Sequence, residues 1–396
     1  MRRFVTPAPS VAPQLLFVVC ALALLVCAAC GRIAYDPVES HAFDGSTRDA
    51  GKRDGSASDA WIDGGVLDGG SGHLRITIAA GTVGEDLIDF PLLVTVVAAD
   101  LARAGAALTA EPRFLSPEHP DPLDHDLRAP ASSGKLVAWV LVPRIHRDAT
   151  TTIDLFTDSA ESRPSDPRAV WRSYAAVWHL DDPPDRPIAD ATGNGGEGVS
   201  LGAMDGTSVV DGIGHRALEF DGVDDGLTVD GGPAITTTDP MTISLWVRNR
   251  AFGLEGPPLF ARAVGFASTQ QDFLVRAWKG CLGGGMYNGA RFSLPCVSWD
   301  DTAVWHHVVL VIDGGTLALY FDGAPGREVA YEGSVAVRGY PFTIGTFGVA
   351  DDTRTWNGAI DEVWLAPIAR SPAWIAALHA SQSGEPFYEL SVVAEW

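Results

Sequence analysis

Two acidic residues, Asp361 and Glu362, stand side by side in the apolar run "IDEVWL" near the end of the chain. Glycoside hydrolysis requires two carboxyl groups, which lie about 5 to 9 Å apart on either side of the sugar bond. The apolar neighbours predict a buried strand, and adjacent side chains of a strand point to opposite faces of its sheet. We therefore expect Asp361 and Glu362 to face apart and to have a structural role, so that this strand provides no catalytic pair.

A possible cation site lies in the glycine-rich turn "DATGNGGEG" at residues 190–198. Asp190 and Asn194 offer side-chain oxygens and the glycines offer carbonyl oxygens, which are the hard ligands that Ca²⁺ prefers. The alternative is a turn whose own Asx hydrogen bonds satisfy these groups. A second acidic stretch, "FDGVDDGLTVD", is predicted to be a hairpin turn between two strands, with a cation site as the alternative.

Aromatic residues in polar, loop-like segments are candidates for a sugar-binding face, because the apolar side of a pyranose ring stacks on an indole or phenol ring. The candidate rings are Trp278, Tyr287, Trp299 and Trp356, and their candidate hydrogen-bonding neighbours are Arg276, Asn288 and Asn357. The alternative is that at least half of these rings fill the core, since tryptophan is highly buried on average.

The first 29 residues have the pattern of an export signal. Arg2 and Arg3 precede the apolar run "LLFVVCALALLV", which is too short to span a bilayer and is typical of a secretory signal peptide. The following "VCAACGR" resembles the cleavage box of bacterial lipoproteins, which implies that Cys30 carries the lipid and becomes the mature N-terminus. By the same resemblance Gly31, which is not the Asp associated with inner-membrane retention, favours the outer membrane or cell surface. The alternative is an ordinary secretory peptide without lipid.

The overall composition favours an all-β protein. Its 43 Gly and 26 Pro, with 12 Trp and many Val and Thr, are typical of short strands joined by tight turns. A formal net charge of −22 argues against nucleic acid and anionic lipid headgroups as partners, so a lipid anchor is the only membrane attachment we expect. Residues 30–72 are rich in Asp, Gly and Ser and predict a disordered tether.

The two cysteines beyond the leader are Cys281 and Cys296. In an exported chain such a pair is more often bridged than free, so we predict a disulfide between them. On the chain-entropy model, closing a loop of about 15 residues stabilises a domain by roughly 3 kcal/mol.

Strand patterns divide the rest of the chain into two domains. At residues 73–165 the runs "HLRITIAAG", "DFPLLVTVV", "GKLVAWVLVP" and "TTIDLFTD" predict a small β-sandwich. Their order resembles the domain of unknown function 2341, a family found in exported bacterial proteins just ahead of lectin-like modules. That resemblance implies no ligand.

The second domain is predicted at residues 170–390. It opens with Trp171, Tyr174 and Trp178, which are predicted to pack across the seam between the domains. Strands then recur between Gly and Asp turns and predict a two-sheet sandwich or jelly roll. One helix is expected at residues 371–382, with Ser371 as its N-cap and a proline in its first turn.

The ordered segments "HLDD", "DATGNGGEG", "ALEFDGVDDGLTVD", "MTISLWVR", "WHHVVLVIDGG" and "GAIDEVWLAP" resemble the LamG-like, concanavalin A-type jelly rolls of lectins and glucanases. This resemblance implies two antiparallel sheets and a binding activity, often towards glycans and occasionally towards proteins. It also implies that Asp190, Asn194 and Asp361 approach one another and hold one structural Ca²⁺ near the sheet edge. The alternative is that Asp361 caps nearby backbone.

Together these patterns predict an all-β chain in which an N-terminal small β-sandwich is followed by a two-sheet, antiparallel, concanavalin A-like jelly roll. We expect a non-catalytic bacterial cell-envelope lipoprotein that binds a glycan or an envelope polymer. The alternative is a structural or adhesive module that binds a surface protein. A glycoside-active enzyme comes third, because the sequence offers no carboxylate pair, nucleophile elbow or metal-ligand cluster.

Overall fold

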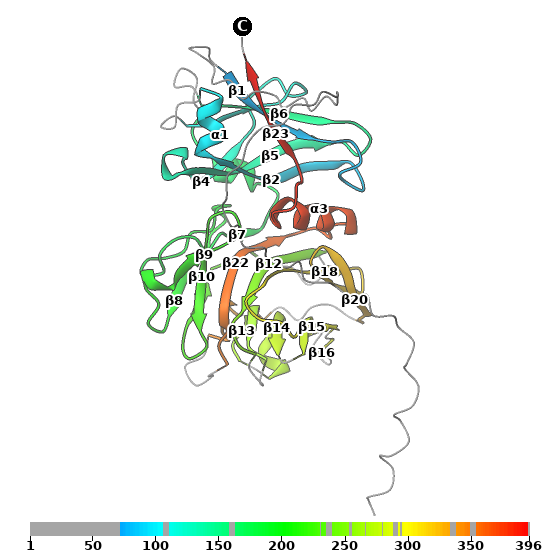
Figure 1. Cartoon of the computed structure of the whole chain (residues 1–396). Coiled ribbons are helices and arrows are strands. Elements are labelled where there is room, and N and C mark those ends of the chain that lie inside the picture. Colours follow the sequence, from blue (N-terminus) through cyan, green and yellow to red (C-terminus); the bar gives the residue numbers. More distant parts are fainter. Residues whose placement is uncertain are drawn as a thin grey trace, which may run out of the picture. The chain divides into compact units, whose positions relative to one another are not determined.

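The computed structural model describes residues 72–105, 111–157, 163–229, 231–234, 240–252, 256–265, 267–278, 280–287, 292–293, 295–332, 338–348 and 354–394. The predicted leader with Cys30 and the predicted tether therefore lie outside the described residues, apart from Gly72. The described strands form four antiparallel sheets, as the all-β prediction requires (Figure 1). Among the described residues, no helix is long and apolar enough to cross a bilayer.

Two of the sheets make a small sandwich, with the strand orders β23-β1-β6-β3 and β2-β5-β4. Leu74, Ile76 and Ile78 alternate into its core, as their spacing predicts. The elements are β1 (Gly72–Ile78), β2 (Leu87–Val97), α1 (Ala98–Arg103), β3 (Arg113–Leu115), β4 (His125–Ala129), a 3₁₀ turn (Ala131–Ser133), β5 (Lys135–Ile145), β6 (Thr151–Phe156) and β23 (Glu389–Ala394).

The last strand of the chain belongs to this first domain. β23 pairs with β1 from Thr77 opposite Glu389 to Gly72 opposite Ala394, and Figure 1 shows the two strands side by side. The jelly roll is thus inserted between β6 and β23 of the sandwich. The sequence-based boundary, which extended the jelly roll to residue 390, misses this return of the chain.

The other two sheets form the jelly roll and enclose one apolar core. The β22 sheet consists of β20 (Ala324–Ala330), β19 (Thr316–Phe321), β18 (Trp305–Asp313), β12 (Met241–Asn249), β22 (Asn357–Ala366), β10 (Arg216–Asp221) and β9 (Val209–Asp211), and β7 (Ala176–Trp178) also pairs with β22. The β14 sheet consists of β16 (Phe292–Ser293), β15 (Cys281–Tyr287), β14 (Gln271–Trp278), β13 (Pro258–Ala263), β21 (Phe342–Ile344), β11 (Gly226–Val229) and β8 (Gly198–Leu201), and β17 (Cys296–Val297) pairs with β15. The remaining short elements are α2 (Pro167–Val170) and two 3₁₀ turns (Gly206–Ser208 and Ser268–Gln270).

Helix α3 (Pro372–Gln382) confirms the predicted helix and its cap. The Ser371 hydroxyl accepts a hydrogen bond from the Trp374 amide, and a proline stands in the first turn. The helix packs on the β22 sheet, where Ile375 joins a cluster with Val309 of β18. That part of the outer face of the sheet is therefore covered.

Aromatic rings fill the seam between the sandwich and the β22 sheet. Trp364 of β22 lies 4.9 Å from Trp139 and 4.8 Å from Trp171, measured between ring centroids. Tyr174 joins the same cluster, whereas Trp178 belongs to the core inside the jelly roll. The predicted seam role is thus correct for Trp171 and Tyr174 and wrong for Trp178. One continuous core spans both domains.

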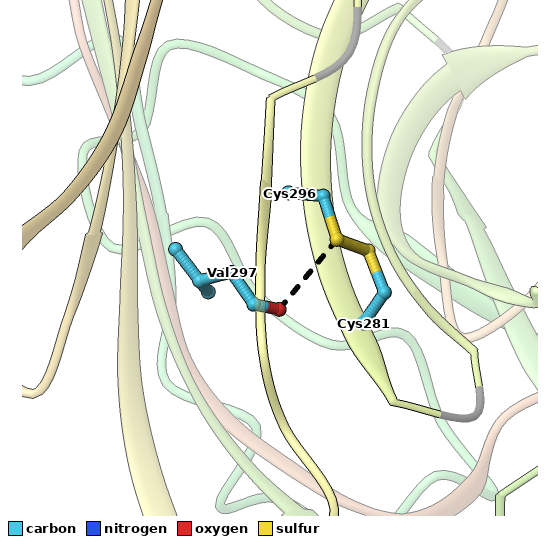
Figure 2. Close-up of a disulfide and its surroundings, with 3 residues drawn as sticks. All are labelled: Cys281, Cys296 and Val297. Carbon is cyan, nitrogen blue, oxygen red and sulfur yellow. Dashed lines mark hydrogen bonds between the residues drawn. A yellow bond between two sulfur atoms is a disulfide. The ribbon is translucent and has the colours of Figure 1, made fainter. Parts of the chain in front are cut away.

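The predicted disulfide between Cys281 and Cys296 is present and joins β15 to β17 (Figure 2). The two Cα atoms are 5.8 Å apart, which is within the usual span of a disulfide. The bond fixes the short β17 strand against the β14 sheet.

Candidate functional site

The acidic pair on β22 does not alternate as predicted. Asp361 pairs with Trp246 and Trp364 pairs with Ser244, so Glu362 and Val363 together stand opposite the single residue between Ser244 and Trp246. This is a β-bulge, and Glu362 has a positive φ of 49°. Ile360 and Val363 both lie in the jelly-roll core. The two acids between them therefore turn to the same outer face, and the prediction that they face apart is wrong.

These carboxyl groups are kept from acting on a sugar by their burial, and not by the directions in which their side chains point. Asp361 is 0% and Glu362 is 5% exposed. Burial and the neighbouring Glu362 raise the pKa of Asp361 well above its usual value, so its carboxyl group keeps a proton to a higher pH than a free aspartate does. Asp361 accepts a hydrogen bond from the Ile213 amide over 2.6 Å, which is the backbone-capping role that the sequence left open.

Glu362 is the end of a hydrogen-bonded chain that crosses the seam. Its carboxylate lies 2.7 Å from His179 Nδ1, and His179 Nε2 lies 3.0 Å from Asp126 of the sandwich. Two indole N–H groups complete the chain: Trp364 donates to Glu362 and Trp171 donates to Asp126, each over 2.8 Å. Burial alone would lower the pKa of His179, but Glu362 and Asp126 raise it to about 10. His179 is therefore an imidazolium at neutral pH.

Arg128 extends this chain to a second carboxylate of the jelly roll. Its guanidinium donates two hydrogen bonds to Asp181, over 2.6 and 2.9 Å, and one to Asp126 over 3.1 Å. We call Asp126, Arg128, His179, Asp181 and Glu362 the seam network. Because each ring nitrogen of His179 already faces a carboxylate, the imidazole has no free position for acid or base catalysis. The network holds the two domains together.

Sequence reasoning missed this network. Its residues come from three separate segments, and only Glu362 was considered there. Two residues could have indicated this network: Asp126, a carboxylate inside the predicted sandwich, and His179 in "VWHLDD". A buried charge needs a partner, so each of these residues predicts an ionic contact.

A cleft lies beside the network. Its volume is about 400 Å³, and both domains and the segment between them contribute to its walls. Leu180, in its wall, has a positive φ of 59°, a strained backbone conformation for a leucine. The lining residues are Arg128, Asp166, Pro167, Arg168, His179, Leu180, Asp181, Asp182, Ile188, Ala189, Asp190 and Ala191.

The predicted calcium ligands form hydrogen bonds with backbone. Asp190 Oδ1 accepts from the amides of Val177 and Thr192, which is the Asx turn that the sequence allowed as the alternative. The Asn194 amide group donates to the carbonyls of Tyr174 and Ala175. Asp190 and Asn194 thus share one turn, while the carboxyl group of Asp361 caps Ile213. Calcium binding by these three residues stays a prediction.

A second acidic turn brings three carboxylates together. Oxygens of Asp221, Asp224 and Asp225 all lie within 4.8 Å of one another, so these residues could hold a cation. Their turn connects β10 of the β22 sheet to β11 of the β14 sheet. The predicted hairpin is therefore wrong, because the chain crosses between sheets at this point.

Two of the predicted sugar-stacking rings fill the core. Trp299 and Trp356 are 2% and 1% exposed, and their ring centroids lie 5.9 Å apart inside the jelly roll. The prediction that they contact ligand is wrong, because both rings pack in the core despite their polar neighbours in the sequence. Asn288 lies outside the described residues. Asn357 begins β22 and packs against the turn at Gly222.

The other three candidates share the outer face of the β14 sheet. Phe273, Val275 and Ala277 of β14 point into the core, so Arg276 and Trp278 point outward. Tyr287 of β15 is outward for the same reason, since Leu282 and Met286 are inward. We call this surface the β14 face.

Cations stack on both aromatic rings of the β14 face. The Arg276 guanidinium lies 4.7 Å from the Trp278 ring, and that of Arg338 lies 4.6 Å from the Tyr287 ring. Trp278 lies across Gly283, where an added Cβ would come within 2.9 Å of the indole. Asp272, which the sequence did not single out, is fully buried here and bonds to the Arg338 amide and guanidinium.

Comparison with known proteins agrees with this architecture. Residues 221–376 match the model of the concanavalin A-like lectin/glucanases superfamily. This match covers β11 through the first half of α3 and so lies within the jelly roll. A comparison with curated proteins found no match. The match bears out the concanavalin A-like jelly roll that the sequence predicted.

Three similar solved structures are distant in sequence. One is domain 4 of AbnA, a GH43 extracellular arabinanase from Geobacillus stearothermophilus in complex with arabinotriose, at 19% identity and a TM-score of 0.41; the alignment covers 52% of this chain and 98% of that one. Another is the binding domain of Paraclostridial Mosquitocidal Protein 1, at 16% identity and a TM-score of 0.42, with 52% of each chain covered. A third is the binding domain of botulinum neurotoxin DC in complex with SialylT, at 12% identity and a TM-score of 0.40, covering 53% of this chain and 52% of that one. The present chain thus spans about half the length of the two toxin domains.

Proposed function

We propose that this protein is a non-catalytic lectin-like module that binds a glycan or envelope polymer on its β14 face. The concanavalin A-like jelly roll supports a binding role. The β14 face is favoured over the β22 sheet because α3 and the sandwich cover a large part of the outer side of that sheet. The observation that carries the proposal is the half-buried Trp278 ring with the Arg276 guanidinium beside it, since an aromatic ring with a neighbouring hydrogen-bond donor can contact both the apolar side and the hydroxyl groups of a pyranose.

We further propose that the leader directs this module to the bacterial cell surface, with a lipid on Cys30 as its anchor. The basic start, the apolar run and the "VCAACGR" box support this. Mass spectrometry of the mature N-terminus tests it: an acylated Cys30 is expected, and an unmodified N-terminus would overturn the anchor without affecting the binding proposal.

The binding proposal is tested with the exported protein on a glycan array, followed by affinity electrophoresis in the polysaccharides that give signals. Trp278→Ala is expected to weaken binding about tenfold or more, which corresponds to about 1.4 kcal/mol. Trp305→Ala is the matched control, because Trp305 also carries a stacked arginine, Arg248 at 4.9 Å, but lies on the β22 sheet. Equal losses in both variants, or an array without signals, would overturn the proposal. A blank array with retained binding to surface proteins would support the adhesive alternative.

A further inference from the structure

The cleft beside the seam network is a second candidate binding site, separate from the β14 face. It is built from three parts of the chain: β4 of the sandwich supplies Arg128, the connecting segment supplies Asp166 to Arg168, and the jelly roll supplies residues 179–182 and 188–191. A volume of about 400 Å³ lies near the lower end of the range of about 300 to 1,000 Å³ that is common for small-molecule sites. The cleft therefore suits a small ligand better than a polymer chain.

One part of the cleft wall consists of charged groups whose hydrogen bonds are already made. Arg128 is held by Asp126 and Asp181, and both nitrogens of His179 face carboxylates. Asp190 accepts from two backbone amides. These groups cannot turn towards a ligand without losing their partners. They form a rigid wall, and the strained backbone of Leu180 persists within it.

Other groups of the cleft retain hydrogen-bonding capacity. Arg168 has no hydrogen bond or ion pair to any described residue, and its guanidinium occupies the space that a side chain at Gly193 would fill. Asp182 has only a 3.5 Å contact with Arg186, and Asp166 uses one oxygen to cap the Ala169 amide. Guanidinium donors and carboxylate acceptors thus line one opening, together with the partly exposed Pro167.

We propose that this cleft binds a neutral sugar of one or two rings. Hydroxyl groups can accept from Arg168 and donate to Asp182 and Asp166 at the same time, whereas a purely anionic or cationic ligand satisfies only one sign of charge. The net charge of −22 and the carboxylates at the opening disfavour an acidic sugar. The partly exposed apolar Pro167 suits the C–H side of a sugar ring. The inference extends the proposed function to a second site and a shorter ligand.

Calorimetry on the exported protein tests this site. The probes are the neutral monosaccharides glucose, galactose, mannose and N-acetylglucosamine and the disaccharides maltose and cellobiose, with glucuronate as the anionic comparison. Arg168→Ala and Asp182→Asn are each expected to weaken the binding of the sugar that the wild type binds by about tenfold or more, with the melting temperature unchanged. Arg172→Ala is the control, because Arg172 belongs to the same connecting segment but pairs with Asp89 outside the cleft. It is expected to bind like the wild type.

Three results would overturn the cleft proposal: no binding of any probe by the wild type, unchanged binding in both cleft variants, or tighter binding of glucuronate than of glucose. Trp278→Ala separates the two proposals, because it is expected to weaken polymer binding about tenfold or more and to leave binding in the cleft unchanged. Loss of small-sugar binding in Arg168→Ala without any polymer binding by the wild type would refute the β14 face and retain the cleft.

Discussion

His179 Nδ1 lies 2.7 Å from Glu362 Oε2, and this contact joins residues 183 positions apart in the chain. Its other ring nitrogen faces Asp126 of the sandwich, so one imidazolium links two buried carboxylates from the two domains. Neither carboxylate has access to bulk water that could replace the histidine. The alignment of the domains therefore depends on His179 staying protonated, and so positively charged, in the folded protein.

Replacing His179 should be strongly destabilising. His179→Ala leaves Asp126 and Glu362 buried without their shared cation, and breaking a buried ion pair from one side costs about 3 to 5 kcal/mol. The matched control is His146→Ala, whose imidazole lies 2.8 Å from Glu118 in a pair that is partly exposed to solvent. That variant should lose no more than about 1 kcal/mol. Urea unfolding of both variants measures the difference, and equal losses would show that the seam network contributes nothing special.

The stability of the protein should fall in alkaline solution through His179. A free histidine has a pKa near 6.5, while that of His179 in the folded protein is about 10. Below pH 6.5 the folded and unfolded chains both carry the proton, and the stabilisation is complete. Between pH 6.5 and about 10 only the folded chain holds it, so stability decreases as pH rises, by up to about 1.4 kcal/mol per pH unit.

The check is the free energy of unfolding at several values between pH 6 and 10 for the wild type and for His179→Ala. The gap between the two should narrow as pH rises. A gap that stays constant over this range would mean that His179 is not the group whose proton is lost.

Asp361→Asn should stabilise the protein at neutral pH. The pKa of Asp361 is raised in the folded state, so the folded chain binds a proton more tightly than the unfolded chain does, and ionisation of Asp361 opposes folding as the pH rises above that of a free aspartate. Asparagine keeps a side-chain oxygen that can accept from the Ile213 amide and needs no proton. The gain should be absent near pH 3, where aspartate is protonated in both states, and should grow towards pH 7. Glu362→Gln is the comparison, and it should destabilise because it removes the charge that faces His179.

Local patterns in the sequence predict the strands, the helix cap and the disulfide well. They predict poorly to which face of the sheet the side chains of β22 point. The alternation of Leu74, Ile76 and Ile78, the Ser371 cap and the cysteine pair are all decided by residues close to them or by simple pairing. The bulge at Glu362 depends instead on the register of β22 against β12, which no periodicity in β22 itself contains.

Burial of rings and the path of the last strand were also beyond local reasoning. Trp299 and Trp356 sit in polar sequence surroundings, yet tertiary packing places them in the core. β23 is mostly exposed or half-buried and lacks a strong apolar pattern, so nothing in its own sequence indicates that it returns to β1. The seam network was missed because its members converge only when both domains are folded.

Removing the disulfide should destabilise the jelly roll moderately. The loop that Cys281 and Cys296 close spans 15 residues. Its loss in the double variant Cys281→Ser and Cys296→Ser should cost about 3 kcal/mol, because the unfolded chain regains that loop's freedom. Unfolding of the wild type with and without reductant provides the same comparison without mutation. Titration of two free thiols in denatured, non-reduced wild type would show that the bond does not form.

The C-terminal segment should be essential for the folding of the whole described part of the chain, although it follows the jelly roll. Phe387 is buried in the core that both domains share, and the Tyr388 hydroxyl accepts from the Thr95 amide of β2 over 2.9 Å. Truncation after Ser383 removes these contacts and β23 together. Loss of the Phe387 ring alone should cost about 3 to 5 kcal/mol. Truncation after Ala394, which keeps β23, is the control and should have little effect.

Calorimetry shows whether the sandwich and the jelly roll unfold in a single cooperative transition. Because the jelly roll is inserted into the sandwich and one core spans the seam, the wild type should unfold in a single transition. In the chain truncated after Ser383, both domains should unfold together at a lower temperature than in the wild type. The opposite result would be a truncated chain in which the jelly roll still unfolds at the wild-type temperature while the transition of the sandwich is missing. That result would show that the seam network and the shared core do not couple the two domains.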